Sequence, residues 1–87
     1  MYTIIGGLKK SDDSKFSFSV FDFITLVKTD VGCEEKIVFE VASSLCDELA
    51  KGNFEGSENA PPGHNPTVII TNNDGELVGS YQKNMGN

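Results

Sequence analysis

At 87 residues and 38% hydrophobic content, the chain has material for one folded domain, residues 1–87, and not for a second core. Its 13 Asp and Glu outnumber seven Lys, no Arg is present, and the net charge is −6. Nucleic acids and anionic lipid surfaces are held mainly by Lys and Arg. The composition therefore disfavours both as direct ligands and favours a protein partner with a basic surface. The alternative is that the net negative charge only keeps a small protein soluble.

The first third of the chain predicts two strands. Tyr2–Leu8 is apolar and β-prone, and the charged segment Lys9–Ser14 is predicted to be a turn. In Lys15–Val27, phenylalanines alternate with serines, which is typical of a half-buried strand. The alternation slips at Val20–Phe21, which predicts a bulge or bend in that strand. A turn is predicted at Thr29–Gly32.

The segment between residues 34 and 51 allows two interpretations. It can form a single helix, whose apolar face would consist of Val38, Val41, Leu45 and Leu49. Alternatively, Lys36–Ala42 forms a strand whose odd-numbered apolar residues point inward, and a short helix follows it. We favour the strand, because β-branched and aromatic side chains lose rotamer freedom in a helix.

The short helix of this second interpretation begins at Ser43 or Ser44, either of which can accept a hydrogen bond as the N-cap. Asp47 lies three positions after Ser44, in a weak capping-box pattern. Asp47 and Glu48 would then lie in the first turn, where carboxylates complement the helix dipole. Gly52 would end the helix.

The last third of the chain predicts a loop and a hairpin. Glu55–Pro66 contains several Gly and Pro turn signals and no periodicity, so we expect a long loop. Thr67–Thr71 is predicted to be a buried strand, Asn72–Gly75 a tight turn and Glu76–Gln82 the last strand, before a loose tail at Asn84–Asn87. The predicted fold class is α+β, a small antiparallel sheet of four to five strands with one short helix, in the order β-β-β-α-β-β.

The two cysteines, Cys33 and Cys46, are predicted to be free thiols. They lie 13 positions apart, which separates their Cα atoms by about 20 Å if the stretch between them is helix and by about 25–35 Å if it is mostly strand. A disulfide needs about 4.4–6.8 Å, so a reducing compartment is expected. The sequence also lacks a secretory signal at its start and an apolar run of the ~18–20 residues that a membrane span needs. We expect a cytoplasmic protein with no membrane partner.

The chemistry-bearing residues do not form a catalytic or metal motif. His64 is the one histidine, and with Cys33 and Cys46 it would give a zinc site two or three ligands at best. His64 and a cysteine could form a nucleophile–base pair, but nothing in the sequence positions an oxyanion hole or an orienting carboxylate. The paired acids lack the spacing of a calcium loop. The sequence predicts no enzyme, no catalytic or metal-binding residues and no cofactor.

The short acidic chain, the β-β-β-α-β-β order and the closing hairpin Thr-Asn-Asn-Asp-Gly-Glu-Leu-Val-Gly (residues 71–79) resemble the small phage-encoded inhibitors of bacterial defence systems, anti-CRISPR proteins among them. The resemblance covers most of the chain as architecture and contains no diagnostic motif, so no site residue is transferred. It implies stoichiometric inhibition in the host cytoplasm, by occupation of a basic nucleic-acid-binding or effector-contact surface on a defence complex.

The leading functional hypothesis is therefore a non-enzymatic protein-binding inhibitor that acts through an acidic surface. The residues expected to contact the partner lie on turns and at the expected helix start, namely Glu34, Glu35, Asp47 and Glu48. The alternative is a housekeeping interaction module or a homo-oligomer, such as a homodimer, that pairs through an open strand edge. A small-molecule binder or enzyme that uses the Pro-rich loop is the weakest hypothesis, because convergent polar groups are missing.

Overall fold

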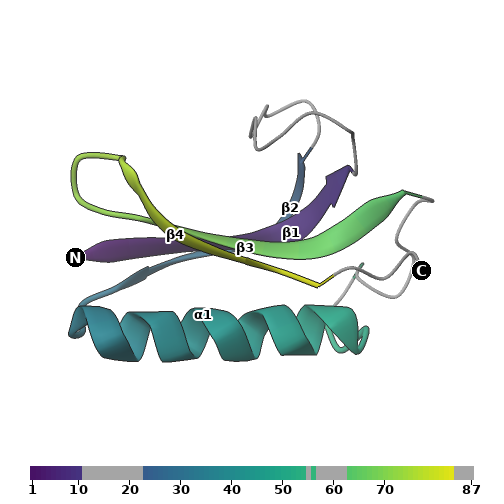
Figure 1. Ribbon diagram of the computed structural model, residues 1–87, viewed down its shortest axis with the longest axis horizontal. Coiled ribbons are helices and arrows are strands. Elements are labelled where there is room, and N and C mark those ends of the chain that lie inside the picture. Colours follow the sequence, from purple (N-terminus) through teal and green to yellow (C-terminus); the bar gives the residue numbers. More distant parts are fainter. Residues whose placement is uncertain (11–22, 55, 57–62, 84–87) are drawn as a thin grey trace.

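A computed structural model describes residues 1–10, 23–54, 56 and 63–83. The fold is α+β, as predicted: four antiparallel strands form one sheet in the order β2-β1-β3-β4, and a helix lies along one face of it (Figure 1). The elements are β1 (Tyr2–Lys10), β2 (Phe23–Val31), α1 (Glu35–Ala50), β3 (His64–Thr71) and β4 (Leu77–Gln82). The element order is β-β-α-β-β, because the segment predicted as a third strand is helical.

The predicted strand Lys36–Ala42 is the first half of α1, so the strand interpretation was wrong. The helix buries one face against the sheet, and the strand propensity of single β-branched residues is too small to outweigh that packing. Ser43 and Ser44 consequently lie in the middle of the helix and do not cap it. The buried residues recur at spacings of three and four positions: Val38, Ala42, Cys46 and Leu49.

Asp47 and Glu48 lie in the last turn of α1 and not in the first turn, where they were predicted. The negative end of the helix dipole makes this an unfavourable place for carboxylates. Lys83, which follows β4, compensates: its Nζ lies 3.0 Å from Oδ1 of Asp47. The helix ends just before Gly52, as expected, and the Gly52 N–H donates a hydrogen bond to the Leu49 carbonyl.

Both N-terminal strands end later in the sequence than predicted. β1 continues through Lys9 and Lys10, which were predicted to begin a turn. β2 continues through Val31, so the predicted turn at Thr29–Gly32 was wrong; Val31 pairs with Tyr2 at the start of β1. The backbone N–H and C=O groups at these strand ends form hydrogen bonds with a neighbouring strand. A local turn pattern in the sequence contains no information about that pairing.

The C-terminal hairpin follows the prediction closely. The turn Asn72–Gly75 joins β3 to β4, and β4 begins one residue later than expected. β3, however, already begins at His64, so the end of the predicted loop Glu55–Pro66 belongs to the sheet. The predicted bend at Val20–Phe21 and the tail Asn84–Asn87 lie outside the described residues.

The sheet contains a bulge where β2 passes two glycines of β1. Gly6 pairs with Val27 and Gly7 pairs with Thr25, so Leu26 is an extra residue in β2. The strands approach so closely there that a β-carbon on Gly7 would collide with the carbonyl oxygen of Ile24. Only glycine leaves room for that backbone, which gives the Gly-Gly pair of β1 a packing role.

The hydrophobic core fills the space between the helix and the sheet. The core side chains are at most 2% exposed, and they come from β1, α1 and β3: Ile4, Val38, Ala42, Cys46, Leu49, Val68 and Ile70. Phe54 packs against this cluster. Burial of this apolar surface is the main stabilising contribution in a domain of this size.

The topology brings two distant segments to one end of the molecule. Thr3 pairs with Asp30 on one side and with Thr71 on the other, so β2 ends beside the start of the β3–β4 turn. Helix α1 begins four residues after β2 ends, so its N-terminus lies at the same end (Figure 1).

Candidate protein-binding site

The structure separates the four carboxylates that the sequence predicted as one contact surface. Glu34 and Glu35 lie at the N-terminus of α1, and Asp47 and Glu48 lie in its last turn. A rise of 1.5 Å per residue over 12 to 13 residues places the two pairs about 18–20 Å apart. They therefore form two separate surfaces at opposite ends of the helix.

The C-terminal pair is already engaged within the chain. Asp47 pairs with Lys83, and the hydrogen bond and charge of Asp47 raise the pKa of the Lys83 ammonium. The side-chain amide of Asn53 donates a hydrogen bond to Glu48. An ion pair leaves less net charge to attract a partner, so this end of the helix is the poorer candidate for electrostatic binding.

The N-terminal pair is more exposed and is fixed in position by the helix start. Glu34 is the N-cap residue, and its carbonyl accepts a hydrogen bond from the Val38 N–H at 3.0 Å. The Tyr2 hydroxyl donates to Oε2 of Glu35 at 3.4 Å, which links β1 to the helix. Burial and the neighbouring Glu35 charge raise the pKa of Tyr2. The positive end of the helix dipole stabilises both carboxylates where they are.

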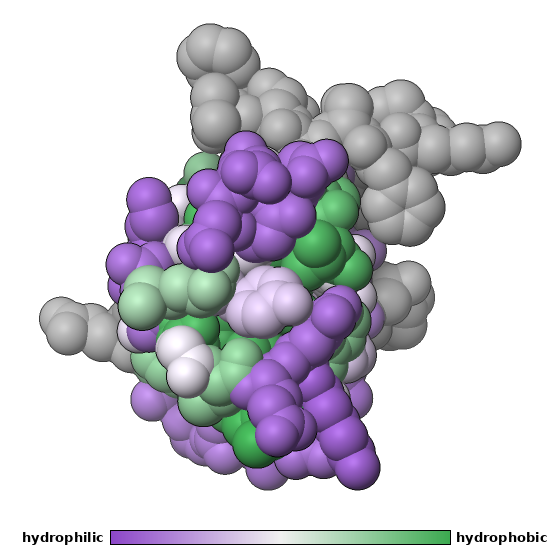
Figure 2. All heavy atoms as spheres, turned by 90° about the vertical axis from the view of Figure 1, so that its left-hand side faces the viewer, coloured by the Kyte–Doolittle hydropathy of each residue, from purple (hydrophilic) through white to green (hydrophobic). Residues whose placement is uncertain are grey.

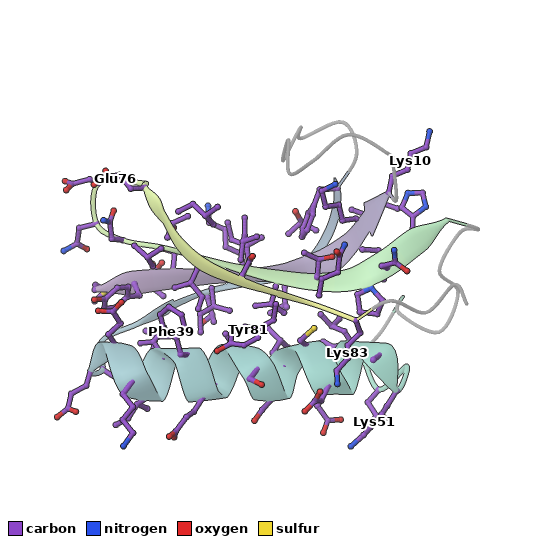
Figure 3. The ribbon with its side chains drawn as sticks, viewed as in Figure 1. Lys10, Phe39, Lys51, Glu76, Tyr81 and Lys83 are labelled. Carbon is purple, nitrogen blue, oxygen red and sulfur yellow. The ribbon has the colours of Figure 1, made fainter. Side chains whose placement is uncertain are left out.

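The β3–β4 turn presents two further acids, Asp74 and Glu76, at the same end of the molecule. Asn72 holds this turn: its Oδ1 accepts hydrogen bonds from the N–H groups of Asp74 and Glu76 at 2.9 and 3.0 Å. Gly75 completes the turn with φ of 79°, a conformation that glycine adopts at little cost. The two carboxylates are therefore displayed on an ordered turn, with Glu76 at its outer edge (Figure 3).

Exposed apolar side chains lie near the two acidic groups. Met1 is 65% exposed, Leu77 at the start of β4 is 51% exposed, and Ile37 in the first turn of α1 is 43% exposed. Figure 2 views this end directly and shows hydrophobic surface between hydrophilic surface above and below. We call the surface formed by these three residues together with Glu34, Glu35, Asp74 and Glu76 the acidic end.

Charge is distributed unevenly along the described part of the chain. Lys10, Lys51 and Lys83 lie away from the acidic end, toward the opposite end of the long axis, whereas Glu76 lies at the acidic end (Figure 3). Lys36 and the N-terminal amine are the basic groups nearest to the four acids. The acids outnumber these two groups, so the acidic end has negative local charge.

Asp74 and Glu76 were missed as contact residues by sequence reasoning, although their turn was predicted correctly. The turn sequence shows that both acids are exposed. What it does not show is that the β3–β4 turn and the start of α1 share one end of the molecule. That proximity depends on the strand order β2-β1-β3-β4.

The thiols and the histidine do not assemble into a catalytic pair. Cys33 precedes α1 at the acidic end, whereas His64 pairs with Lys10 at the opposite end of the sheet. Cys46 is buried, its thiol points to the Pro66 carbonyl at 3.8 Å, and burial raises its pKa. Among the described residues, no three His, Cys, Asp or Glu side chains come together as a metal site.

Comparison with known proteins found no matching family model, no matching curated protein and no matching solved structure. Within the described ranges, no helix has the length and hydrophobicity that crossing a membrane requires. The acidic end combines negative charge with exposed apolar groups.

Proposed function

We propose that this protein is a non-enzymatic protein-binding inhibitor that docks its acidic end on a basic, nucleic-acid-binding surface of a partner. The observation that supports the proposal is the placement of Glu34 and Glu35 at the same end as Asp74 and Glu76, with exposed apolar residues near them. The resemblance to phage-encoded inhibitors implies that this surface belongs to a bacterial defence complex. The protein would act in the cytoplasm, which is the host cytoplasm if a phage encodes it.

Charge and apolar contact have different roles in this mechanism. Complementary charges accelerate the encounter of two proteins and orient them. Affinity then depends mainly on a few apolar or aromatic side chains that become fully buried at the centre of the contact. Met1, Leu77 and Ile37 are exposed and would provide those central contacts, and the four acids would steer the approach of the partner.

The experiment that tests this function compares three immobilised forms of the protein in a bacterial lysate. One is the wild type, one carries Glu34→Lys with Glu35→Lys, and the third carries Glu40→Lys with Glu48→Lys as the control. Each double reversal adds +4 to the net charge of −6, so both variants have −2. The two variants differ only in which part of the helix loses its acids.

We expect the wild type and the control to retain the same basic, nucleic-acid-binding protein, and the Glu34/Glu35 variant to lose it. Retention should survive nuclease treatment, because the chain itself has too few cations to bind through nucleic acid. Equal retention by all three forms would refute the acidic end as the binding surface. Loss from both variants would show that only total charge matters.

A further inference from the structure

The two edge strands of the sheet differ in how the helix covers them. At β4, the Phe39 and Tyr81 rings pack edge to face with centroids 6.2 Å apart, and Lys83 pairs with Asp47, so the helix closes this edge (Figure 3). Helix α1 packs across β3, β1 and β4. The other edge strand, β2, lies beyond the helix and is longer, with nine residues against six.

Apolar side chains border β2 on its helix side. The helix row Ile37, Val41 and Leu45 has a spacing of four residues, so its members share one side of α1. Leu45 and Val27 both border Gly6, which places this row on the β2 side of the helix. Ile37 and Val41 are each 43% exposed. The β2 edge therefore combines an unpaired strand with adjacent exposed apolar groups.

β2 has one basic and one acidic residue on the same face, and these restrict what can pair with this edge. Lys28 and Asp30 lie two positions apart on the sheet face opposite the helix, and both are exposed. Thr3 Oγ1 donates to Oδ1 of Asp30 at 2.8 Å, which fixes that carboxylate on this face and leaves its other oxygen available. No other described strand pairs with β2 on its outer side.

We propose that β2 pairs with β2 of a second copy of this chain, antiparallel and about a two-fold axis at Thr29. In this register, Lys28 of each copy lies opposite Asp30 of the other, which gives two cross-strand ion pairs. On the helix side, Val27 lies opposite Val31 of the other copy. Shifting the axis to Lys28 or Asp30 would place like charges directly opposite each other, so the sequence selects the Thr29 register.

This pairing extends two four-stranded sheets into one continuous sheet. It satisfies backbone groups that an exposed edge strand otherwise leaves to water, and it covers apolar surface of the Ile37–Val41 row. The Lys28–Asp30 ion pair forms twice in each dimer, because a two-fold axis repeats every contact. The inference does not depend on the proposed function, since Glu34, Glu35, Asp74 and Glu76 take no part in it and Ile37 is the one residue that belongs to both surfaces.

Charge exchange across the strand tests the register. The variants are Lys28→Asp, Asp30→Lys and the double exchange Lys28→Asp with Asp30→Lys. The control is Lys36→Asp, which changes the net charge by the same amount as Lys28→Asp but lies on the helix. Sedimentation velocity over a concentration series distinguishes the 9.4 kDa chain from a particle of twice that mass. Far-UV circular dichroism confirms that each variant is folded.

We expect the wild type, the double exchange and the Lys36→Asp control to dimerise. Each of the two β2 single variants should dimerise at least about tenfold more weakly, because two pairs change from attraction to repulsion at once. An equimolar mixture of Lys28→Asp and Asp30→Lys should recover dimers, since one copy then presents two acids and the other two lysines. A monomeric wild type up to millimolar concentration, dimers that persist in both single variants, or a mixture that stays monomeric would each overturn the proposal.

Discussion

Gly7 and Gly79 are the two glycines of the sheet at which neighbouring atoms leave the least room for a side chain. A β-carbon on Gly7 would meet backbone of β2, and one on Gly79 would lie 2.5 Å from Cε2 of the Phe39 ring. Backbone within a sheet cannot move aside without breaking its pairing, whereas an aromatic ring can adjust its torsion angles. The two positions should therefore respond differently to the same methyl group.

We expect Gly79→Ala to lower the free energy of unfolding by about 1–3 kcal/mol, and Gly7→Ala to lower it by more. Ser80→Ala, at the exposed neighbour of Gly79 in β4, is the control and should change stability by less than about 0.5 kcal/mol. Urea unfolding of the three variants measures these differences. If Gly7→Ala were as stable as the wild type, the close strand approach at the bulge would be wrong.

The two thiols should differ sharply in reactivity. Cys33 is exposed and Cys46 is buried. Burial is the main cause that raises the pKa of Cys46, and the negative charge of Asp47 raises it further. Because the thiolate is the reactive form, Cys46 should resist alkylation in the folded protein while Cys33 reacts. Mass spectrometry after iodoacetamide treatment should show one added group under native conditions and two in denaturant. A chain that takes up no label when denatured without reductant would contain a disulfide and contradict the fold.

At the level of elements, the hairpin was predictable and the helix was not. The turn Asn72–Gly75 is specified locally, because Asn and Gly have the backbone preferences that the turn needs. In Lys36–Ala42, local preference and tertiary packing conflict: the β-branched residues favour a strand, but Val38 and Ala42 at a spacing of four complete the buried face of a helix. The single-helix alternative contained two of the four buried positions, Val38 and Leu49.

A matched pair of valines distinguishes the helix from the strand. Val38 is fully buried in α1, whereas Val41 is 43% exposed; the strand interpretation would place Val41 inward and Val38 outward. Val38→Ala should lower the free energy of unfolding by about 2 kcal/mol through lost burial and an unfilled cavity. Val41→Ala should be nearly neutral, because alanine has the higher helix propensity. Thermal melts of both variants provide the comparison. If Val41→Ala were more destabilising than Val38→Ala, the strand interpretation of Lys36–Ala42 would be correct.

At the level of the whole molecule, the sequence selected two of the four acids that lie at the acidic end. Glu34 and Glu35 could be selected from their position beside an expected turn, but Asp47 and Glu48 were selected because they were expected at the start of a short helix. The 16-residue helix separates them, and the strand order replaces them with Asp74 and Glu76. Such groupings depend on topology, which no local pattern in this sequence encodes.

The central claim is that the acidic end binds a basic partner surface, and association kinetics test it most directly. The partner retained in the lysate experiment is titrated with the wild type, the Glu34→Lys/Glu35→Lys variant and the Glu40→Lys/Glu48→Lys control. Each titration is carried out at about 0.1 M salt, where the Debye length is about 10 Å, and at about 1 M salt, where it is about 3 Å. We predict that the association rate constant of wild type and control falls at least about tenfold at the higher salt while dissociation changes less, and that the Glu34/Glu35 variant associates slowly at both. Association rates that are the same for all three proteins at both salt concentrations would contradict the claim.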